Sequence, residues 1–497
     1  MKTLIKKHFG VVFIISIFLF LIGFNCILHP MYIYSVDDWT YIGVTRTALP
    51  QIDAWNPIKV LPEIMMPFFA RIGVYFISPI ISGGEIPDYI NGMAISYGLI
   101  YSLIWTIYFG LIYKMLKILM TDKKGGPIFA TLAILIAHFA VFNDKTYLFW
   151  TWSATSVFNY TIPLLLNAFI ILISECIINK KNQEDCRIFI SQNYYKMGFL
   201  ILLGYMCIFS NIVDSIVSAS YFGVLVLLRV LKIKKINKEE IIKFFKDTYL
   251  YIAYVLAWFV SALMELGGAR ADSLEVKNSN FIETTMNGFV RVISHFRIRA
   301  LLVIFLLFVA VFFIIINRKK EQYVQSFKGI IKMILVMGIT VLFYVLLGAR
   351  AGAEYMETGI LSGSMLPLVI IAIYIFSLVL NKMKIIAIFM PLMIVISSFS
   401  TLFYNEYADY NYISPQNIYE FDNYIIDSAL EADNSGVTDI EILVPICLSE
   451  DNFPLAVTYG GDRISNALYE LGITSNHINI TLIADEKINN QFNIKIK

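Results

Sequence analysis

Two adjacent carboxylates, Asp37 and Asp38, stand in the stretch "YSVDDWTYIG" a few residues after the first apolar run of the chain. A carboxylate that is partly removed from water gains proton affinity, which is what a general base needs. A simpler role is also open, because Asp is common just before a helix begins. Capping explains one Asp more easily than two, so the pair is a candidate catalytic site with Asp37 or Asp38 as the base.

Polar and aromatic residues gather in two further stretches that lie between apolar runs. The turn at 138–163 is unusually aromatic, and the tight connection at 209–220 keeps an Asp near its tip. Ionisable groups near membrane depth are costly and suggest function, although at a hairpin tip they also serve to cap helices. Aromatic rings beside the acidic pair fit an interfacial belt as well as a sugar-binding surface. The candidate sugar- or acceptor-binding residues are Trp39, Tyr41, Asp144, Trp152, Asn159, Asp214 and Tyr355.

Several cations follow apolar runs on the same side as the acidic pair, where positive residues are disfavoured. The stretches "ELGGARAD" (265–272) and "LLGARAGAEY" (346–355) echo each other, and "RVISHFRIR" (291–299) concentrates Arg residues. A guanidinium group matches phosphate oxygens in a bidentate manner. The alternatives are an Arg that stabilises a helix C-terminus and one that anchors to anionic lipid headgroups. The candidate phosphate-binding residues are Arg350, Arg270, Arg297 and Lys59.

The elements that must position these residues are membrane helices. The chain of 497 residues is 58% hydrophobic and only 15% charged, with a mean hydropathy of +0.69, whereas soluble domains carry about 25% charged residues. Its apolar runs of about 20 residues are long enough to cross a bilayer. We therefore predict an all-α polytopic membrane protein with spans near 9–28, 90–113, 127–143, 154–178, 197–213, 215–231, 248–266, 299–317, 330–348, 360–380 and 384–401.

Lys and Arg residues orient these spans. The loops "KTLIKKH", "KMLKILMTDKK", "NKKNQEDCR", "LKIKKINKEEIIKFFK", "NRKKEQ" and "NKMK" are basic and alternate with loops that carry few cations. The basic set should be cytoplasmic, which predicts a cytoplasmic N-terminus, about eleven spans and an outer C-terminus. In the first outer loop (29–89), the apolar stretch 64–81 is bracketed or interrupted by Pro62, Pro67 and Pro79, so we expect an interfacial or re-entrant helix there.

The tail from residue 402 is more polar and acidic than the rest of the chain. "TDIEILVPI" (438–446) has the pattern of a short buried strand, and "DRISNALYELGI" (462–473) that of an amphipathic helix ended by a glycine. We predict a transmembrane domain over 1–401 and a small extracytoplasmic α/β module over 402–497 that leans on it.

Several classes of chemistry leave no trace in the sequence. It has no GxxxxGK[ST] phosphate loop, no dinucleotide-binding GxGxxG, no HExxH and no paired metal-ligand spacing. Nothing indicates a nucleic-acid partner. The energy for a reaction must therefore arrive with an activated substrate at the outer face of the cell membrane.

The order of these elements resembles the GT-C superfamily of polytopic glycosyltransferases. A cytoplasmic N-terminus with a retained first span is followed by an acidic pair in the first outer loop and by proline-rich interfacial helices. "DDW-Y", the following "WNPIKVLPEIMMPFFARIG" and the turn "FW-W…NYTIP" are most similar to bacterial members that glycosylate O-antigen or cell-wall polymers, including the GtrII-like group.

This resemblance implies a hexose donor linked to a polyprenyl phosphate and a surface glycan or wall polymer as acceptor, on the extracytoplasmic side. It implies that Asp37 or Asp38 deprotonates the acceptor hydroxyl, and that Arg350, with Arg270 and Arg297 behind it, binds the leaving phosphate. It implies no obligatory cofactor. An acidic pair binds a divalent metal in some relatives, so metal dependence stays open.

Two other functions compete with this interpretation. A polysaccharide polymerase or ligase would also pair outer arginines with lipid-linked sugars, but the early "DDW" and the proline-rich stretch argue against it. A transporter or flippase of lipid-linked sugars would place charges near the bilayer midplane. The middles of the predicted spans are nearly free of charge, and Glu175 and Glu265 lie near predicted span ends.

Overall fold

Long helices make up most of the structure, as the apolar runs predict. The computed structural model describes residues 9–43, 61, 64–83, 87–120, 125–140, 153–181, 194–233, 237–266, 282–287, 290, 309, 312, 316, 321–351, 363–382, 391, 414–446 and 459–494. The long helices are α2 (Phe9–Gly23), α6 (Tyr89–Leu119), α7 (Gly126–Ala140), α9 (Ile162–Lys181), α10 (Tyr194–Ile208), α11 (Ile212–Val230), α12 (Lys238–Leu266), α16 (Glu321–Ala351) and α17 (Met365–Lys382).

Within the described residues, six helical segments are long and apolar enough to cross a bilayer, which makes this a multi-pass membrane protein. Each coincides with a predicted span. The predicted spans 127–143, 197–213 and 360–380 correspond to the shorter apolar helices α7, α10 and α17, while 299–317 and 384–401 fall almost entirely outside the described residues. The six segments are Phe9–Leu28, Tyr89–Leu119, Ala154–Lys180, Ile212–Val230, Lys238–Glu265 and Tyr323–Arg350.

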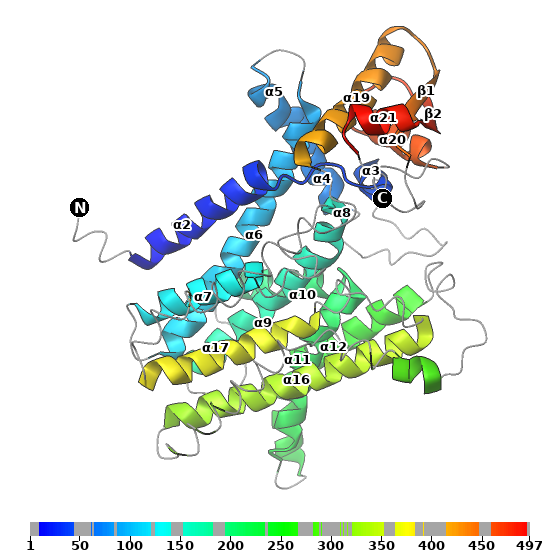
Figure 1. The fold of residues 1–497 in the computed structure, drawn as a ribbon. Coiled ribbons are helices and arrows are strands. Elements are labelled where there is room, and N and C mark those ends of the chain that lie inside the picture. Colours follow the sequence, from blue (N-terminus) through cyan, green and yellow to red (C-terminus); the bar gives the residue numbers. More distant parts are fainter. Residues whose placement is uncertain are drawn as a thin grey trace.

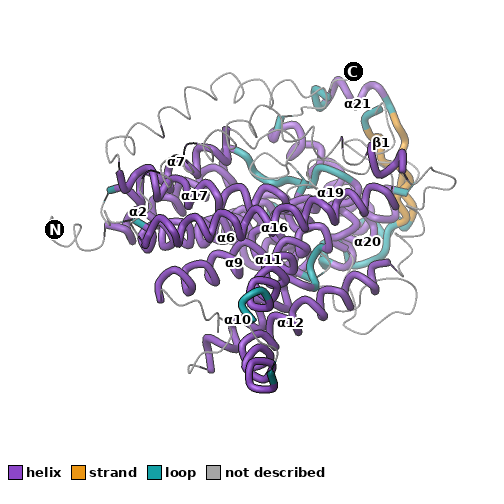
Figure 2. Tube along the Cα trace, turned by 90° about the horizontal axis from the view of Figure 1, so that it is seen from below, coloured by secondary structure: helices purple, strands orange, loops and turns teal. Residues whose placement is uncertain are grey.

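The long helices pack side by side into one bundle (Figures 1 and 2). Helix α6 contacts α2, α7 and α9, while α11 contacts α9, α12 and α16, and α16 also contacts α17. The interior of the bundle is rich in aromatic rings such as Trp105 and Tyr101, which are almost fully buried. Apolar side chains cover its outside as well, since Leu19 and Leu263 are 62% and 67% exposed. An apolar surface of this kind suits contact with lipid rather than water.

Short helices gather at the end of the bundle where α6 and α9 begin (Figure 1). Three π-helical turns lie in the same region, an element that is rare and often occurs near functional sites. One continuous helical path runs through α8, a π-turn and α9. The short helices are α3 (Val36–Gly43), α4 (Met65–Ile72), α5 (Ser78–Ile81) and α8 (Ala154–Ser156), and the π-turns are η1 (Phe24–Leu28), η2 (Gly73–Ile77) and η3 (Val157–Thr161).

The stretch 64–81 forms a helical segment in which α4, η2 and α5 follow one another without a break. Pro67 lies in the first turn of α4, where no intrahelical donor is lost, and Pro79 lies at the start of α5. The π-turn η2 directly before Pro79 changes the hydrogen-bond register, which accommodates a residue that lacks an N–H. The prolines therefore reshape this helix rather than interrupting it, and the stretch is helical as predicted.

The C-terminal segment, defined here as residues 414–446 and 459–494, contains both helices and strands. Strand β1 pairs in parallel with β2, from Asp439 opposite Asn479 to Val444 opposite Ala484. The strand predicted within 438–446 and the helix predicted within 462–473 are both confirmed. Helix α20 lies close to β2, because a Cβ on Gly461 would come within 1.9 Å of the Ile480 carbonyl oxygen. The elements are α19 (Pro415–Asn434), β1 (Asp439–Val444), α20 (Gly460–Glu470), β2 (Asn479–Ala484) and α21 (Glu486–Gln491).

The C-terminal segment packs against the short helices of the first loop (Figure 1). Helix α20 contacts α3, and α19 contacts α6. Hydrogen bonds join the surfaces: the Tyr75 hydroxyl donates to the Leu471 carbonyl at 2.6 Å, and the Tyr419 hydroxyl donates to Asp88 at 2.9 Å. Residues far apart in the sequence therefore meet around helix α3, which carries the acidic pair.

Candidate functional site

Asp38 is fully buried, and its carboxylate accepts four hydrogen bonds. One oxygen, Oδ2, accepts from the backbone amides of Tyr34 at 2.9 Å and Ser35 at 3.1 Å. The other, Oδ1, accepts from the amide of Thr155 at 2.7 Å and the hydroxyl of Ser153 at 3.0 Å. These bonds saturate the carboxylate, so Asp38 joins the first loop to helix α8.

The surroundings of Asp38 are two helix N-termini that face each other. Ser35 precedes the first turn of α3, and the carboxylate three residues later accepts from its amide, which is one half of a capping box. On the other side, Ser153 caps α8 by accepting from the Ser156 amide at 3.2 Å. Helix N-termini carry partial positive charge, which favours a carboxylate between them. Burial nevertheless raises the pKa of Asp38, against the effect of its hydrogen bonds.

A second buried carboxylate, Asp422 of α19, holds the same loop from the C-terminal segment. Its Oδ2 accepts from the Ile33 amide at 3.1 Å, so three consecutive backbone amides, of residues 33, 34 and 35, all donate to carboxylates. Burial raises the pKa of Asp422 well above its usual range, and the nearby charge of Asp38 raises it further. The loop between η1 and α3 is thus fixed from two sides.

Asp37 differs sharply from its neighbour, because it is exposed in the first turn of α3. The helix beneath it is anchored by Trp39 and Ile42, which are 1% and 0% exposed. At its end, Gly43 lies directly on α20, since a Cβ there would come within 2.9 Å of the Ala467 backbone. Asp37 is therefore an accessible carboxylate on a rigidly held helix, which is the arrangement that a general base requires.

The acidic pair does not fit a site in which both carboxylates bind one metal. The oxygens of Asp38 each accept two N–H or O–H donors and have no lone-pair direction left for a cation. In the part of the chain that the structure describes, no group of three or more His, Cys, Asp and Glu side chains could hold a metal ion. Of the two carboxylates of the pair, Asp37 is the exposed one.

Two of the other predicted residues are linked to this region through hydrogen bonds. Asn159 lies in η3, shortly after Thr155, and its carbonyl accepts from the Asn211 side chain at 2.9 Å. Asn211 caps α11, whose first turn contains the fully buried Asp214. The Tyr344 hydroxyl donates to the Val213 carbonyl at 2.6 Å and brings α16 to the same place. Asn159, in the helical path from α8 to α9, and Asp214, in the first turn of α11, are thus brought into the same region through Asn211.

Three of the remaining predicted residues lie within the described part of the chain. The Trp39 ring is buried and packs in the core, whereas Tyr41 is partly exposed. Arg350 is exposed in the last turn of α16, and that helix contacts α11 and α17 rather than α3. The residues Lys59, Asp144, Trp152, Arg270, Arg297 and Tyr355 lie outside the described residues.

A buried charged network inside the bundle is absent from the sequence-based interpretation, which placed Glu175 near a span end. Glu175 is fully buried and forms an ion pair with Lys332 of α16. It also accepts from the Tyr221 hydroxyl at 2.5 Å and from the Tyr374 hydroxyl. The Asn179 side chain donates to Tyr374 at 2.9 Å. Both Glu175 oxygens are therefore paired, and the network joins α9 to α11, α16 and α17.

Comparisons with known proteins found one similar solved structure. No family model matches the chain, and no curated protein matches it. Among solved structures, the chain is similar to the oligosaccharyltransferase of Archaeoglobus fulgidus, crystallised in complex with zinc and sulfate. The likeness covers 95% of this chain and 62% of that chain, with 11% sequence identity and a TM-score of 0.37. The chain thus spans less than two thirds of that protein's length, and function is inferred from the residues of the site.

Proposed function

We propose that the protein is a membrane glycosyltransferase of the GT-C type. It moves a hexose from a polyprenyl-phosphate-linked donor to a surface glycan or wall polymer on the extracytoplasmic side of the cell membrane. The observation that supports the proposal most directly is that the two carboxylates of the acidic pair have different environments. Asp38 is buried and saturated, while Asp37 is exposed on the same helix, at the end of the bundle that the positive-inside rule assigns to the outer side.

The proposed reaction needs a base and a stabilised leaving group. The acceptor hydroxyl oxygen forms a bond to the anomeric carbon of the donor while its proton passes to the Asp37 carboxylate. The bond between that carbon and the phosphate oxygen breaks, and the lipid phosphate leaves with the electron pair. A cation near the departing phosphate stabilises its charge. We propose Arg350 for this role, with Arg270, Arg297 and Lys59 as the other candidates.

The sequence left open whether Asp37 or Asp38 is the base, and the environments of the two carboxylates favour Asp37. A base must have an oxygen that an acceptor can reach, and Asp37 is exposed whereas Asp38 has no free lone pair. Asp38 is instead a positioning residue that fixes the loop beneath the base. We propose a reaction without a metal, since the pair cannot chelate one through both carboxylates.

The test compares cells that carry the wild-type chain, Asp37→Asn or Asp427→Asn at matched membrane levels. Asp427 is an exposed carboxylate of α19 and serves as the control. We expect Asp37→Asn to lose a sugar from the surface polysaccharide while its lipid-linked donor persists, both measured by mass spectrometry. A general base contributes about 10²- to 10⁴-fold, so the loss should be nearly complete.

The outcomes separate the competing functions. If the surface sugar is unchanged in Asp37→Asn, the carboxylate is not the base and the proposal fails. A flippase would instead alter the distribution of the lipid-linked donor between the two membrane faces, without the donor persisting outside. Addition of EDTA to isolated membranes should leave transfer unchanged, and a loss that Mg²⁺ or Mn²⁺ restores would contradict the metal-independent reaction.

A further inference from the structure

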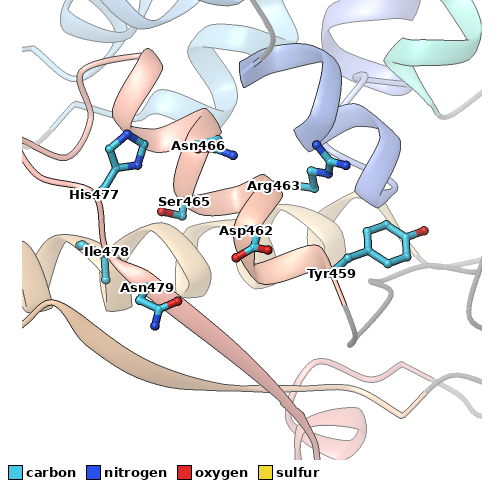
Figure 3. A pocket seen from close by; sticks show the side chains of 8 residues that line it. All are labelled: Tyr459, Asp462, Arg463, Ser465, Asn466, His477, Ile478 and Asn479. Atoms are coloured by element: carbon cyan, nitrogen blue, oxygen red, sulfur yellow. The ribbon is translucent and has the colours of Figure 1, made fainter. Parts of the chain in front are cut away.

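A polar pocket of about 450 Å³ opens on the C-terminal segment, within the size range of ligand sites. It lies along one side of helix α20 and ends at the turn that leads into β2 (Figure 3). None of the functional assignments above uses it. The residues that line it are Tyr459, Asp462, Arg463, Ser465, Asn466, His477, Ile478 and Asn479.

The lining favours a ligand that is neutral and rich in hydroxyl groups. It is lined by one carboxylate, Asp462, and one guanidinium, Arg463, so its lining has no excess of positive charge for a phosphate or a carboxylate. Ile478 is its single aliphatic residue, which gives a lipid chain little to contact. A sugar hydroxyl both donates and accepts, and therefore suits a wall that alternates carboxylate, guanidinium, amide and hydroxyl groups.

Two aromatic features of the pocket also suit a sugar ligand. Tyr459 is 42% exposed at one end of the pocket, where a ring can cover the apolar face of a sugar. At the other end, the His477 ring stacks on Tyr469 with 3.9 Å between ring centroids. This stacking holds the imidazole in place before a ligand arrives, which lowers the entropy cost of binding.

The pocket and the candidate base share helix α20. One side of α20 rests on α3, through the contact between Gly43 and Ala467, and the neighbouring side lines the pocket. Figure 3 shows the Arg463 side chain directed from the pocket towards helix α3. Because α3 also carries the exposed Asp37, a molecule in the pocket would lie beside the helix of the base.

We propose that this pocket binds a sugar unit of the acceptor glycan and presents the acceptor to Asp37. This inference rests on the proposed function and extends it by naming the acceptor subsite. Asp462 and Asn466 would hold the sugar hydroxyls, and Tyr459 would cover its ring. The C-terminal segment would then decide which glycan the enzyme extends.

Binding can be measured without catalysis, by saturation-transfer NMR on the full chain in lipid nanodiscs, because maltoside detergents would compete. The probes are the methyl glycosides of glucose, galactose and N-acetylglucosamine. We expect at least one of them to bind the wild type and Asp37→Asn alike. Asp462→Ala and Asn466→Ala should weaken that binding about tenfold, the effect of losing one strong hydrogen bond.

The control is Glu441→Gln, which changes an exposed carboxylate of β1 outside the pocket and should bind as the wild type does. Asp462 and Asn466 are exposed, so their variants should fold, which a thermal melt checks. The inference is overturned if no glycoside binds, as a peptide-binding pocket would behave, or if both pocket variants bind normally.

The two proposals fail separately. If Asp37→Asn abolishes transfer while the pocket variants keep both glycoside binding and transfer, the acceptor subsite is wrong and the base assignment stands. If the pocket variants lose glycoside binding while Asp37→Asn still transfers sugar, the pocket stands and the base assignment is wrong.

Discussion

Asp37 and Asp38 are neighbours in the sequence, yet their side chains are in opposite environments. Asp38 lies between the N-termini of α3 and α8, whereas Asp37 is exposed one residue earlier on the same helix. The helical rotation of 100° per residue accounts for the difference, because adjacent positions point to different faces. The acidic pair thus consists of one buried carboxylate that fixes the loop and one exposed carboxylate.

The buried Asp422 gives a prediction about pH. Because its pKa is raised in the folded protein, its contribution to stability is present below its usual pKa of 3.8 and is lost as the pH rises through the raised value. Asp422→Asn keeps an oxygen for the Ile33 amide without the charge. We expect this variant to be more stable than the wild type at about pH 8 and to lose that advantage at about pH 5.

Thermal melting of both proteins in the same lipid nanodiscs checks this prediction. The quantity compared is the difference in melting temperature between variant and wild type at each pH, which cancels the titration of all other groups. Asp38 faces the same loop, and removing the Asp422 charge also relieves its repulsion. A difference that stays constant from about pH 5 to about pH 8 would show that Asp422 does not titrate in this range.

Part of the candidate site could be predicted from the sequence. The two adjacent carboxylates were predicted as a candidate site, but the sequence left open which of them is the base. The partners of Asp38 could not be predicted, because Ser153 and Thr155 are 115 and 117 residues away. Asp422 is 389 residues from Ile33 and left no local signal.

Among the secondary-structure elements, the close contact between α3 and α20 fixes the position of the C-terminal segment against the first loop. Gly43→Ala would bring a Cβ within 2.9 Å of the Ala467 backbone, which cannot move aside as a flexible side chain would. We expect this variant to lose about 1–3 kcal/mol, the usual cost of overpacking. Hydrogen exchange should show faster exchange in α20, and the proposed transfer activity should fall with it.

Gly23→Ala is the matched control for Gly43→Ala. Gly23 also lies at the end of a helix, but a Cβ there would meet nothing within 4 Å. This variant should melt and exchange as the wild type does. Equal behaviour of the two variants would mean that α3 and α20 are not in close contact in the working protein.

The elements themselves follow from the sequence to different degrees. The runs of apolar residues were sufficient to predict the long helices, and the pattern of 439–444 was sufficient to predict a strand. A helix over 64–81 was predicted as well, but the π-turn that allows this helix to continue through Pro79 was not. Which helices pack together depends on contacts between distant residues, and no short window of sequence contains them.

At the scale of the whole molecule, one buried carboxylate joins four helices through an ion pair and hydrogen bonds. Glu175 of α9 is paired with Lys332 of α16 and accepts from Tyr221 of α11 and Tyr374 of α17. Removing only the cation leaves a buried charge, so Lys332→Met should destabilise the protein by about 3–5 kcal/mol. The double variant Glu175→Gln with Lys332→Met should recover most of that loss, since no charge remains.

Melting temperature and membrane yield of the single and double variants measure this coupling. Arg71→Met is the control, because Arg71 and Glu470 form a partly exposed pair at 3.6 Å whose loss should cost less than about 1 kcal/mol. A double variant as unstable as Lys332→Met would mean that Glu175 has another role, and the transporter alternative would then gain support.

The hydrogen bond between Ile33 and Asp422 joins the beginning of the chain to its last part, across 389 residues. During synthesis the first loop is made early, but it must wait for every later helix to be inserted before Asp422 arrives. Contacts between such distant segments form late in folding. A nascent or truncated copy would therefore carry Asp37 on an unsupported loop, and only completed chains would present an ordered site at the membrane.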